Sequence, residues 1–261
     1  MEELFLKANL ELKKAADWIA ANKLTLNIKK TKYILFRPKT ARIDFENLKL
    51  KIANETIERI GKGCTSKFFK FVGIHLDEFL DWDYQINHVA SKMSSGNFIL
   101  SRAKNLLPLN IRKTNYNSLV RSHMEFGILS FGTALSGKIK KLTQIQKKCV
   151  RNIAGCNLRS HTDPLFQKYN ILKFDDLVFY NQCAFMHKLL INKQPKSFCD
   201  FFKKTPNFDL PTVEDAVGDT ILNIARRSYV YMVDKLKNVS VGRLPTATLP
   251  RAWNSLSEEF K

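Results

Sequence analysis

The segment KFFKFVGIHLDEFLDWDYQINHVASKM, residues 67–93, decides the fold, because the spacing of its apolar residues changes within it. Residues 67–76 form an aromatic and β-branched run that predicts a strand, and Gly73 inside the run predicts a bulge or a close backbone approach. From residue 83 onward the apolar residues recur every three or four positions, which predicts a helix that ends near Lys104. The chain therefore changes here from a part that contains strands to a part made of helices.

The residues before this segment predict one helix and several strands. Residues 3–21 carry apolar side chains at helical spacing without an interrupting Gly or Pro, which predicts an amphipathic helix. Residues 33–36 are a short aromatic and β-branched run that predicts a buried strand. Residues 48–53 alternate apolar and basic side chains, and residues 56–60 are expected to return as the second strand of a hairpin.

The residues after this segment predict further helices. Asn110 is a suitable N-cap for a helix that runs to about His123, and a third helix lies between Gly137 and Gly155. Another helix is expected to begin at residue 175 or 176, whereas residues 192–261 are expected to be loosely ordered. The fold class predicted from this order is α+β, with a helix and β-hairpins followed by a mainly α-helical region.

The charge of the chain is strongly positive and unevenly distributed. The 261 residues include 43 Lys and Arg against 24 Asp and Glu, a formal net charge of +19, and residues 101–200 alone carry 17 basic and 5 acidic side chains. Residues 126–162 contain no acidic side chain at all. A dense field of one sign attracts a polyanion, so nucleic acid is the expected partner; a solvated lysine face that only keeps the protein in solution is the alternative.

Composition also bears on the membrane and on the compartment. The longest uncharged stretch, residues 126–137, is 12 residues long, whereas a membrane span needs about 20 apolar residues. The first residues lack the apolar core of a secretory signal, and the 5 Cys have no framework spacing. We therefore expect no membrane association and an intracellular protein with reduced thiols, in the nucleus or the cytoplasm.

Several motifs together resemble reverse transcriptases of non-LTR (LINE-type) retrotransposons. A W-x-x-x-N-K-L-x-L-N-x-x-K-T motif begins at Trp18, an F-V-G-I-x-L-D motif at Phe71 and a W-x-x-x-I-x-x-V motif at Trp82. Residues 116–127 (YNSLVRSHMEFG), 145–155 (IQKKCVRNIAG) and 250–256 (PRAWNSL) are similar to later segments of the same family. Each motif alone is weak, but their order and spacing cover nearly the whole chain.

The resemblance implies an architecture for the chain. It divides the chain into a palm remnant (1–80), a helical thumb (81–135), a basic helical region (136–191) and a C-terminal extension (192–261). Residues 21–36 match polymerase motif D, in which Lys30 is the best match for the lysine that can protonate the leaving pyrophosphate. Residues 71–76 match motif E, the primer grip, which presses the primer 3′ end toward the catalytic metals.

The resemblance and the charge together predict how nucleic acid is bound. RNA, DNA or an RNA–DNA hybrid is the expected partner, held mainly through its backbone in a ribonucleoprotein. The primer-grip-like residues are Phe71, Val72, Gly73, Ile74 and His75. The expected nucleic-acid-binding residues are Arg112, Lys113, Arg121, Lys138, Lys140, Lys141, Lys147, Lys148, Arg151 and Arg159.

The catalytic carboxylates of the family are not expected in this chain. The intact family enzyme uses two Mg²⁺ held by Asp residues, among them the pair of an (F/Y)-A-D-D hairpin, and Lys cannot replace them. The sequence has no F/Y-x-D-D motif; Phe174-Asp175-Asp176 lacks the spacer, and its carboxylates are expected to cap a helix. We therefore expect no cofactor in this chain and no polymerase activity, unless the missing polymerase part is supplied in trans.

Other residues have alternative interpretations. Lys30 is more simply a solvated lysine, and His75 is expected to face solvent or duplex. Cys149, Cys156 and His161 fit no compact zinc-finger spacing. Cys183 and His187, four residues apart on one helical face, could supply two ligands, but Cys183 is expected to be a buried thiol. Asp81 and Asp83 are expected to cap rather than to bind metal. The aromatic residues Phe98, Tyr116, Phe126 and Phe131 are expected in the core rather than stacked on bases.

Two functional alternatives to a polymerase fragment are a repurposed RNA- or DNA-binding protein and a basic helical scaffold. An open strand edge and exposed apolar surface are expected to make the isolated chain poorly soluble.

Overall fold

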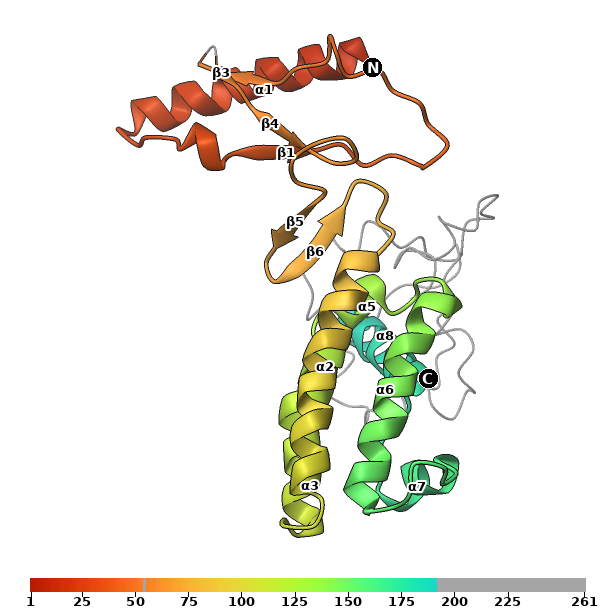
Figure 1. The fold of residues 1–261 in the computed structure, drawn as a ribbon. Coiled ribbons are helices and arrows are strands. Elements are labelled where there is room, and N and C mark those ends of the chain that lie inside the picture. The colour runs from red at the N-terminus through yellow and green to blue at the C-terminus, as the bar shows by residue number, and fades with distance from the viewer. Residues whose placement is uncertain (54, 192–261) are drawn as a thin grey trace, which may run out of the picture. The chain divides into compact units, whose positions relative to one another are not determined.

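The computed structural model describes residues 1–53 and 55–191, which form helices and a few short strands (Figure 1). The α+β class predicted from the sequence is confirmed at this level. The described chain divides into two compact units, residues 1–85 and residues from 86 onward. The loosely ordered extension and the PRAWNSL motif predicted within residues 192–261 lie outside the described residues.

The first unit contains a long helix and three two-stranded sheets. The pairs are β1 with β4, β2 with β3, and β5 with β6. Its elements are α1 (Glu2–Ala21), the 3₁₀-helix η1 (Ile28–Lys30), β1 (Lys32–Ile34), β2 (Lys51–Ile52), β3 (Glu55–Thr56), β4 (Glu58–Ile60), β5 (Phe68–Phe71) and β6 (Ile74–Asp77). The predicted helix 3–21 and a strand near 33–36 are therefore present, although β1 is only half-buried.

The predicted hairpin of residues 48–60 is much smaller than expected. β2 and β3 pair antiparallel over two residues each, and β4 then leaves the hairpin to pair in parallel with β1, so that Tyr33 lies opposite Arg59. The side chains of Ile57 and Ile60 are buried along this turn of the chain. The alternating pattern of residues 48–60 predicts pairing between neighbouring strands. The longer pairing, however, joins β4 to β1, which lies more than twenty residues earlier in the chain.

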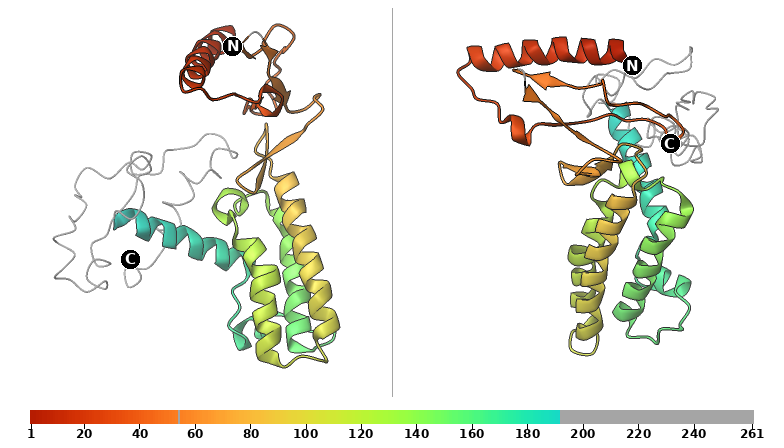
Figure 2. Two further views of the ribbon diagram at one scale, coloured as in Figure 1. Left: turned by 90° about the vertical axis from the view of Figure 1, so that its left-hand side faces the viewer. Right: turned by 45° about the horizontal axis from the view of Figure 1, so that its top comes forward.

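Helix α1 is held to the strands by a few specific contacts. The Asn9 side chain donates to the Lys49 carbonyl at 3.1 Å and accepts from the Lys51 amide at 2.9 Å, so it continues the hydrogen bonding of the edge of β2. Phe5 is buried and meets the Tyr33 ring edge-on at 6.0 Å. Figure 2 shows α1 running alongside these strands. Much of the apolar surface of α1 stays exposed, including Trp18 and Leu10.

The predicted strand 67–76 is in fact a tight hairpin, so the bulge expected at Gly73 is wrong. Phe71 pairs with Ile74, which leaves Val72 and Gly73 as a two-residue loop with φ of 46° and 86°. Positive φ at both central residues is the geometry of a type I′ turn, which matches the twist of the two strands. A β-branched Val is unfavourable at positive φ and favours strands, so Val72 made residues 67–76 resemble one continuous strand.

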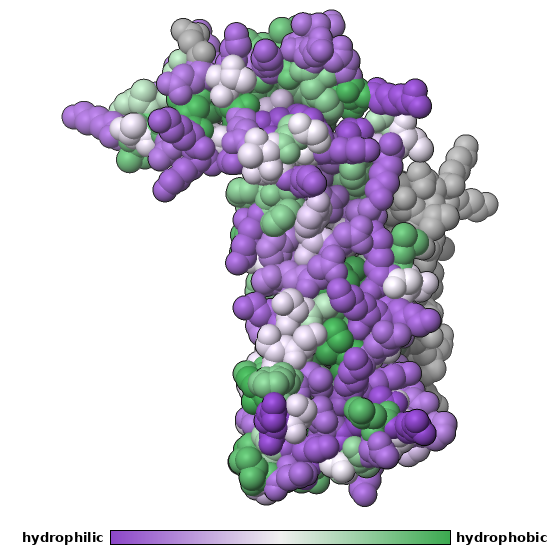
Figure 3. All heavy atoms as spheres, viewed as in Figure 1, coloured by the Kyte–Doolittle hydropathy of each residue, from purple (hydrophilic) through white to green (hydrophobic). Residues whose placement is uncertain are grey.

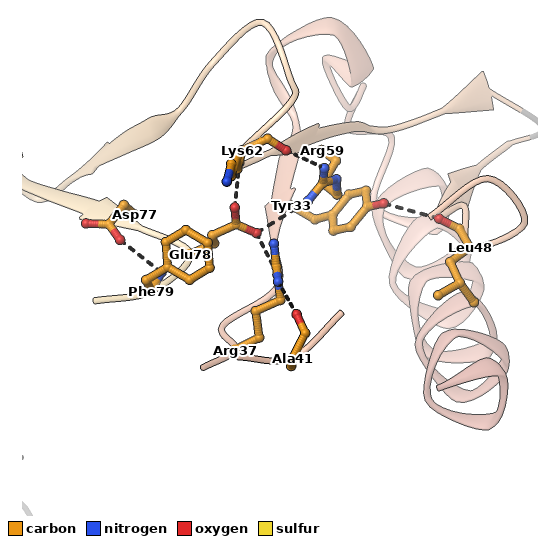
Figure 4. Close-up of polar contacts among 9 residues, drawn as sticks. All are labelled: Tyr33, Arg37, Ala41, Leu48, Arg59, Lys62, Asp77, Glu78 and Phe79. Carbon is orange, nitrogen blue, oxygen red and sulfur yellow. Dashed lines mark hydrogen bonds and ion pairs between the residues drawn. The ribbon is translucent and has the colours of Figure 1, made fainter. Parts of the chain in front are cut away.

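A buried ion-pair network closes the first unit at the end of β6 (Figure 4). The Glu78 side chain is 1% exposed, and its Oε2 accepts from Arg37 Nε at 3.0 Å and Arg59 Nη1 at 3.4 Å. The Arg59 guanidinium also lies over the Phe45 ring at 3.7 Å. A Cβ at Gly61 would come within 2.9 Å of the Glu78 carboxylate, so glycine is required at this close approach.

The described part of the second unit, residues 86–191, is helical. The helices are α2 (Asp83–Ala103), α3 (Leu109–Tyr116), the π-helix η2 (Asn117–Arg121), α4 (Ser122–Glu125), α5 (Ile128–Phe131), α6 (Ser136–Ala154), α7 (Asp163–Lys168) and α8 (Phe174–Leu190). The helices predicted for 83–104, 137–155 and from 175 are confirmed within one or two residues. Asn110 is not an N-cap, because the helix begins at Leu109 with Pro108 as its cap residue. The short helices α5 and α7 were not predicted.

Helices α2, α3 and α6 form the body of this unit (Figures 1 and 2). Hydrogen bonds join Asn87 to Lys141 and Asn97 to Asn152, so α2 and α6 run parallel. Gly96 lets α2 approach η2 closely, because a Cβ there would lie 2.7 Å from the Leu119 carbonyl oxygen. Helices on both sides of residue 135 therefore pack into a single compact unit.

The buried amide of Gln146 connects three segments of the helical unit. Its Nε2 donates to the Tyr116 hydroxyl at 3.0 Å and to the Leu172 carbonyl at 2.9 Å. Its Oε1 accepts from the backbone N–H of Phe174 at 3.0 Å, an N–H that the first turn of α8 cannot pair internally. Gln146 is 0% exposed, so this polar group is buried with its hydrogen bonds made.

Candidate nucleic-acid interface

Helix α6 separates its residues cleanly into a buried and a basic side. Its buried residues are Ile139, Leu142, Ile145, Gln146, Cys149, Val150, Asn152 and Ile153. At 100° per residue these positions occupy one side of the helix, and the basic residues from 140 to 151 fall on the opposite side. Gly155, at φ 69°, ends the helix in the left-handed conformation, as predicted.

The basic ridge is the set of cations on the outer side of α6. Its members are Lys140, Lys141, Lys147, Lys148 and Arg151. They span about 16 Å along the helix axis, a length over which one nucleic-acid strand presents about five phosphates. Lys140, Lys141 and Lys148 are exposed, and α6 contains no acidic residue. The face of the helical unit shown in Figure 3 is mainly hydrophilic.

Two contacts orient members of the ridge without neutralising them. Lys141 Nζ donates to Asn87 Oδ1 at 2.8 Å, and Arg151 Nε donates to the Ser160 carbonyl at 2.8 Å. Both acceptors are uncharged. The first acid after the ridge, Asp163, forms an ion pair with Lys173 at 2.8 Å, and the hydrogen bond from Lys173 holds the pKa of the Asp163 carboxyl below its usual value. The charge of Lys147, a member of the ridge, also lowers the pKa of the Asp163 carboxyl, so this carboxylate offsets part of the positive field at that end of the ridge.

The remaining predicted cations differ in their availability. Arg112 is half-buried against the end of α6, where Nη1 donates to the Asn152 carbonyl at 3.4 Å. Arg121 forms an ion pair with Glu125 at 2.9 Å. Arg159 is exposed beyond the helix, whereas Lys138 is half-buried in its first turn. The structure therefore gathers five of the ten predicted cations on one ridge and engages Arg112 and Arg121 in contacts within the unit.

The primer-grip-like residues lie on the β5–β6 hairpin of the first unit. Phe71 and Val72 are 58% and 76% exposed, and Phe71 shares one hairpin face with its partner Ile74. His75 is only 9% exposed, and its backbone N–H and Nδ1 both lie within 3.0 Å of Gln85 Oε1. The expectation that His75 faces solvent or duplex is therefore wrong; alternation along β6 turns it toward the start of α2.

Lys30 and the two aspartates that superficially resemble the catalytic pair lie in helices. Lys30 is exposed in η1, and its backbone N–H bonds to Asn27 Oδ1 at 3.1 Å. Asp175 and Asp176 lie in the first turn of α8, where their negative charges interact favourably with the positive end of the helix dipole. The N-cap residue is Lys173, whose side chain makes no capping hydrogen bond. The capping role expected for these two aspartates is thus electrostatic only.

Of the four aromatic residues predicted to lie in the core, two are buried and two are exposed. Tyr116 and Phe131 are buried as expected, but Phe98 and Phe126 are 59% and 53% exposed, so the core expectation is wrong for these two. Cys149 is buried, and burial raises the pKa of its thiol to about 12. Within residues 1–53 and 55–191, no three His, Cys, Asp or Glu side chains form a group that could hold a metal ion.

A cavity beside the π-helix was not predicted from the sequence. It has a volume of about 160 Å³ and is lined by α3 and η2 on one side and by residues 170–172 and α8 on the other. Lys113, Asn117 and Arg121 supply its polar wall. The sequence offered only the spacing of two cations eight residues apart, Lys113 and Arg121, with the polar Asn117 between them.

None of the helices in the described residues is both long and apolar enough to cross a membrane. The comparisons with known proteins give no relatives: no protein-family model, no curated protein and no solved structure matches the chain.

Proposed function

We propose that this chain binds nucleic acid through the backbone phosphates, with the basic ridge of α6 as the principal contact. The observation that carries the proposal is the segregation of α6, in which an acid-free set of five cations faces away from a side made of core residues. Cations at this density repel one another. Binding to phosphates relieves this repulsion and is favoured further because the phosphates release their condensed counterions.

We further propose that the chain is the palm-end and thumb part of a non-LTR retrotransposon reverse transcriptase. Support comes from the order of its motifs and from the element order of the two units. The F-V-G-I-x-L-D motif folds as a hairpin with exposed aromatic residues, and the residues matched to the thumb fold as helices. In this proposal the chain grips a template–primer and does not itself transfer nucleotides, because the sequence has no F/Y-x-D-D motif.

Neutralising the ridge tests the binding proposal. The triple variant Lys140→Gln, Lys141→Gln, Lys148→Gln should bind an RNA–DNA hybrid ~100-fold more weakly at low salt, because three phosphate contacts are lost. The slope of log K against log salt should become shallower by about 2.7, which is 0.9 for each contact. Fluorescence anisotropy across a salt series measures both quantities.

A matched triple variant in the first unit, Lys13→Gln, Lys14→Gln, Lys29→Gln, removes the same charge from exposed positions. It should change the affinity several-fold at most. Equal losses in the two triple variants would mean that net charge alone drives binding and that the ridge is not the contact. No binding of the hybrid by the unaltered chain at low salt would favour a basic helical scaffold.

A further inference from the structure

We infer that the cavity beside η2 binds the base of a single pyrimidine-sized nucleotide, presented by a single strand, with its phosphate against the cationic wall. The inference rests on the proposed nucleic-acid binding and adds a site that recognises a base. It is separate from the basic ridge, because none of the ridge residues lines the cavity.

The size of the cavity limits the ligand to one ring. Its volume is about 160 Å³, and an apolar protein cavity of about 150 Å³ accommodates benzene. A pyrimidine ring is of the same size, whereas a purine has a second ring. Met124, Leu172 and Leu177 supply apolar side chains against which the face of a ring can pack.

The polar wall matches the remainder of a nucleotide. Lys113, Asn117 and Arg121 lie at four-residue intervals, so they form one line of about 12 Å along the α3–η2 helix. Two of the five N–H groups of Arg121 bond to Glu125, which fixes the guanidinium in place and leaves further donors for a phosphate. Among the lining residues no side chain is acidic.

Two amide side chains can read the edge of a base. Asn117 comes from η2 and Asn170 from the opposite wall, and each offers both a donor and an acceptor. Asn170 has φ of 53°, a left-handed conformation that Asn tolerates better than most other non-glycine residues. The π-helical turn that carries Asn117 is a rare element that occurs frequently at functional sites.

Free nucleotides test the site without the ridge. Thymidine monophosphate should shift the side-chain amide resonances of Asn117 and Asn170 in ¹H–¹⁵N NMR spectra, and ribose 5-phosphate should not. Adenosine monophosphate should produce smaller shifts because its base has two rings. Absence of shifts with thymidine monophosphate, or equal shifts with all three compounds, would overturn the inference.

Oligonucleotides test the site in the bound strand. A twelve-nucleotide oligo-dT should bind the unaltered chain about 5- to 100-fold more tightly than an abasic strand of the same length and charge, the range expected for stacking of one base. Asn117→Trp, which fills the cavity mouth, should abolish this ratio but keep the salt slope. Asn105→Trp, at an exposed position outside the cavity, should keep both.

The outcomes separate the two proposals. Absence of hybrid binding by the unaltered chain at low salt, with thymidine monophosphate still shifting the asparagine amides, would overturn the ridge as the contact and retain the cavity. Equal affinity of the unaltered chain for oligo-dT and the abasic strand, with the salt slope intact, would overturn the cavity as a base site and retain the ridge.

Discussion

At the scale of single residues, local backbone demands and local side-chain chemistry can disagree. Val72 occupies a turn position with φ of 46° that suits Asn or Gly, and its side chain is 76% exposed, so packing does not compensate for the strain. Gln146 shows the opposite case, in which a polar residue in the core makes three hydrogen bonds and connects α6 to α3 and α8.

Val72→Asn should stabilise the first unit by about 1 kcal/mol, because Asn tolerates the left-handed conformation that the type I′ turn imposes. Urea unfolding followed by circular dichroism measures the change. Val72→Ala serves as the control, since it removes the β-branch but keeps a Cβ poorly suited to positive φ, and it should give a smaller gain. An unchanged or lower unfolding free energy for Val72→Asn would contradict the strain.

Tyr116 should make stability depend on alkaline pH. Burial raises the pKa of its hydroxyl to about 12. Because the unfolded state ionises near pH 10 and the folded state only near pH 12, the stabilisation is complete below pH 10 and is lost as pH rises through this window.

At pH 11 about 1.4 kcal/mol of the advantage that Tyr116 gives the folded state should be gone. The measurement is the difference in unfolding free energy between the unaltered chain and Tyr116→Phe, which cancels the other titrating groups. That difference should shrink by this amount between pH 9 and pH 11. A constant difference would show that the hydroxyl is not shielded from water.

At the scale of elements, close helix contacts rather than helix propensity determine how the second unit packs. Gly96 brings α2 against η2, and Gly132 brings the end of α5 within reach of Val178 of α8, whose Cγ2 would lie 2.8 Å from an added Cβ. These approaches fix the positions of the surrounding helices because interiors are packed almost without voids.

Gly96→Ala should lower the free energy of unfolding by about 1–3 kcal/mol, because the new Cβ meets the Leu119 carbonyl and the helices must separate. Gly137→Ala is the matched control. It also lies in a helix, but nothing is within 4 Å of its added Cβ, so it should be neutral or stabilising by up to about 1 kcal/mol. Thermal unfolding of both variants compares them, and similar losses would contradict the close approach.

Elements with a local signal were predictable, and elements with a distant partner were not. The boundaries of α6 followed from its apolar spacing and from Gly155, and both are properties of the segment itself. The parallel pairing of β4 with β1 joins residues far apart in the chain. The alternation of apolar and polar residues shows that a segment is a strand but does not show which distant strand it pairs with. The β5–β6 turn was missed because Val72 is not a turn residue by type.

The candidate site was predictable only in part, for the same reason. The charge of α6 and its acid-free surroundings are visible in the sequence, so the ridge was anticipated. The engagement of Arg112 by the end of α6 and the burial of His75 against Gln85 depend on tertiary contacts. The cavity beside η2 depends on the π-helical turn and on residues 170–172, and neither has a sequence signature.

At the scale of the whole molecule, the net charge of +19 favours the proposed binding of nucleic acid. The purified chain should give no primer extension with Mg²⁺ and nucleotides, because Lys side chains cannot hold the two metal ions that phosphoryl transfer needs. Anisotropy of the same labelled primer–template in the same buffer is the control, since it should report binding. Metal-dependent extension by the purified chain would contradict the proposed non-catalytic role.

The neutral anchoring of α6 by Gln146 has a consequence for how the protein responds to ionic strength. Dissolved ions weaken long-range attraction between exposed charges but leave a buried amide and its uncharged partners almost untouched. They also relieve the mutual repulsion of the five outward-facing cations. Under the proposed binding, concentrated salt should therefore release the bound polyanion without unfolding α6.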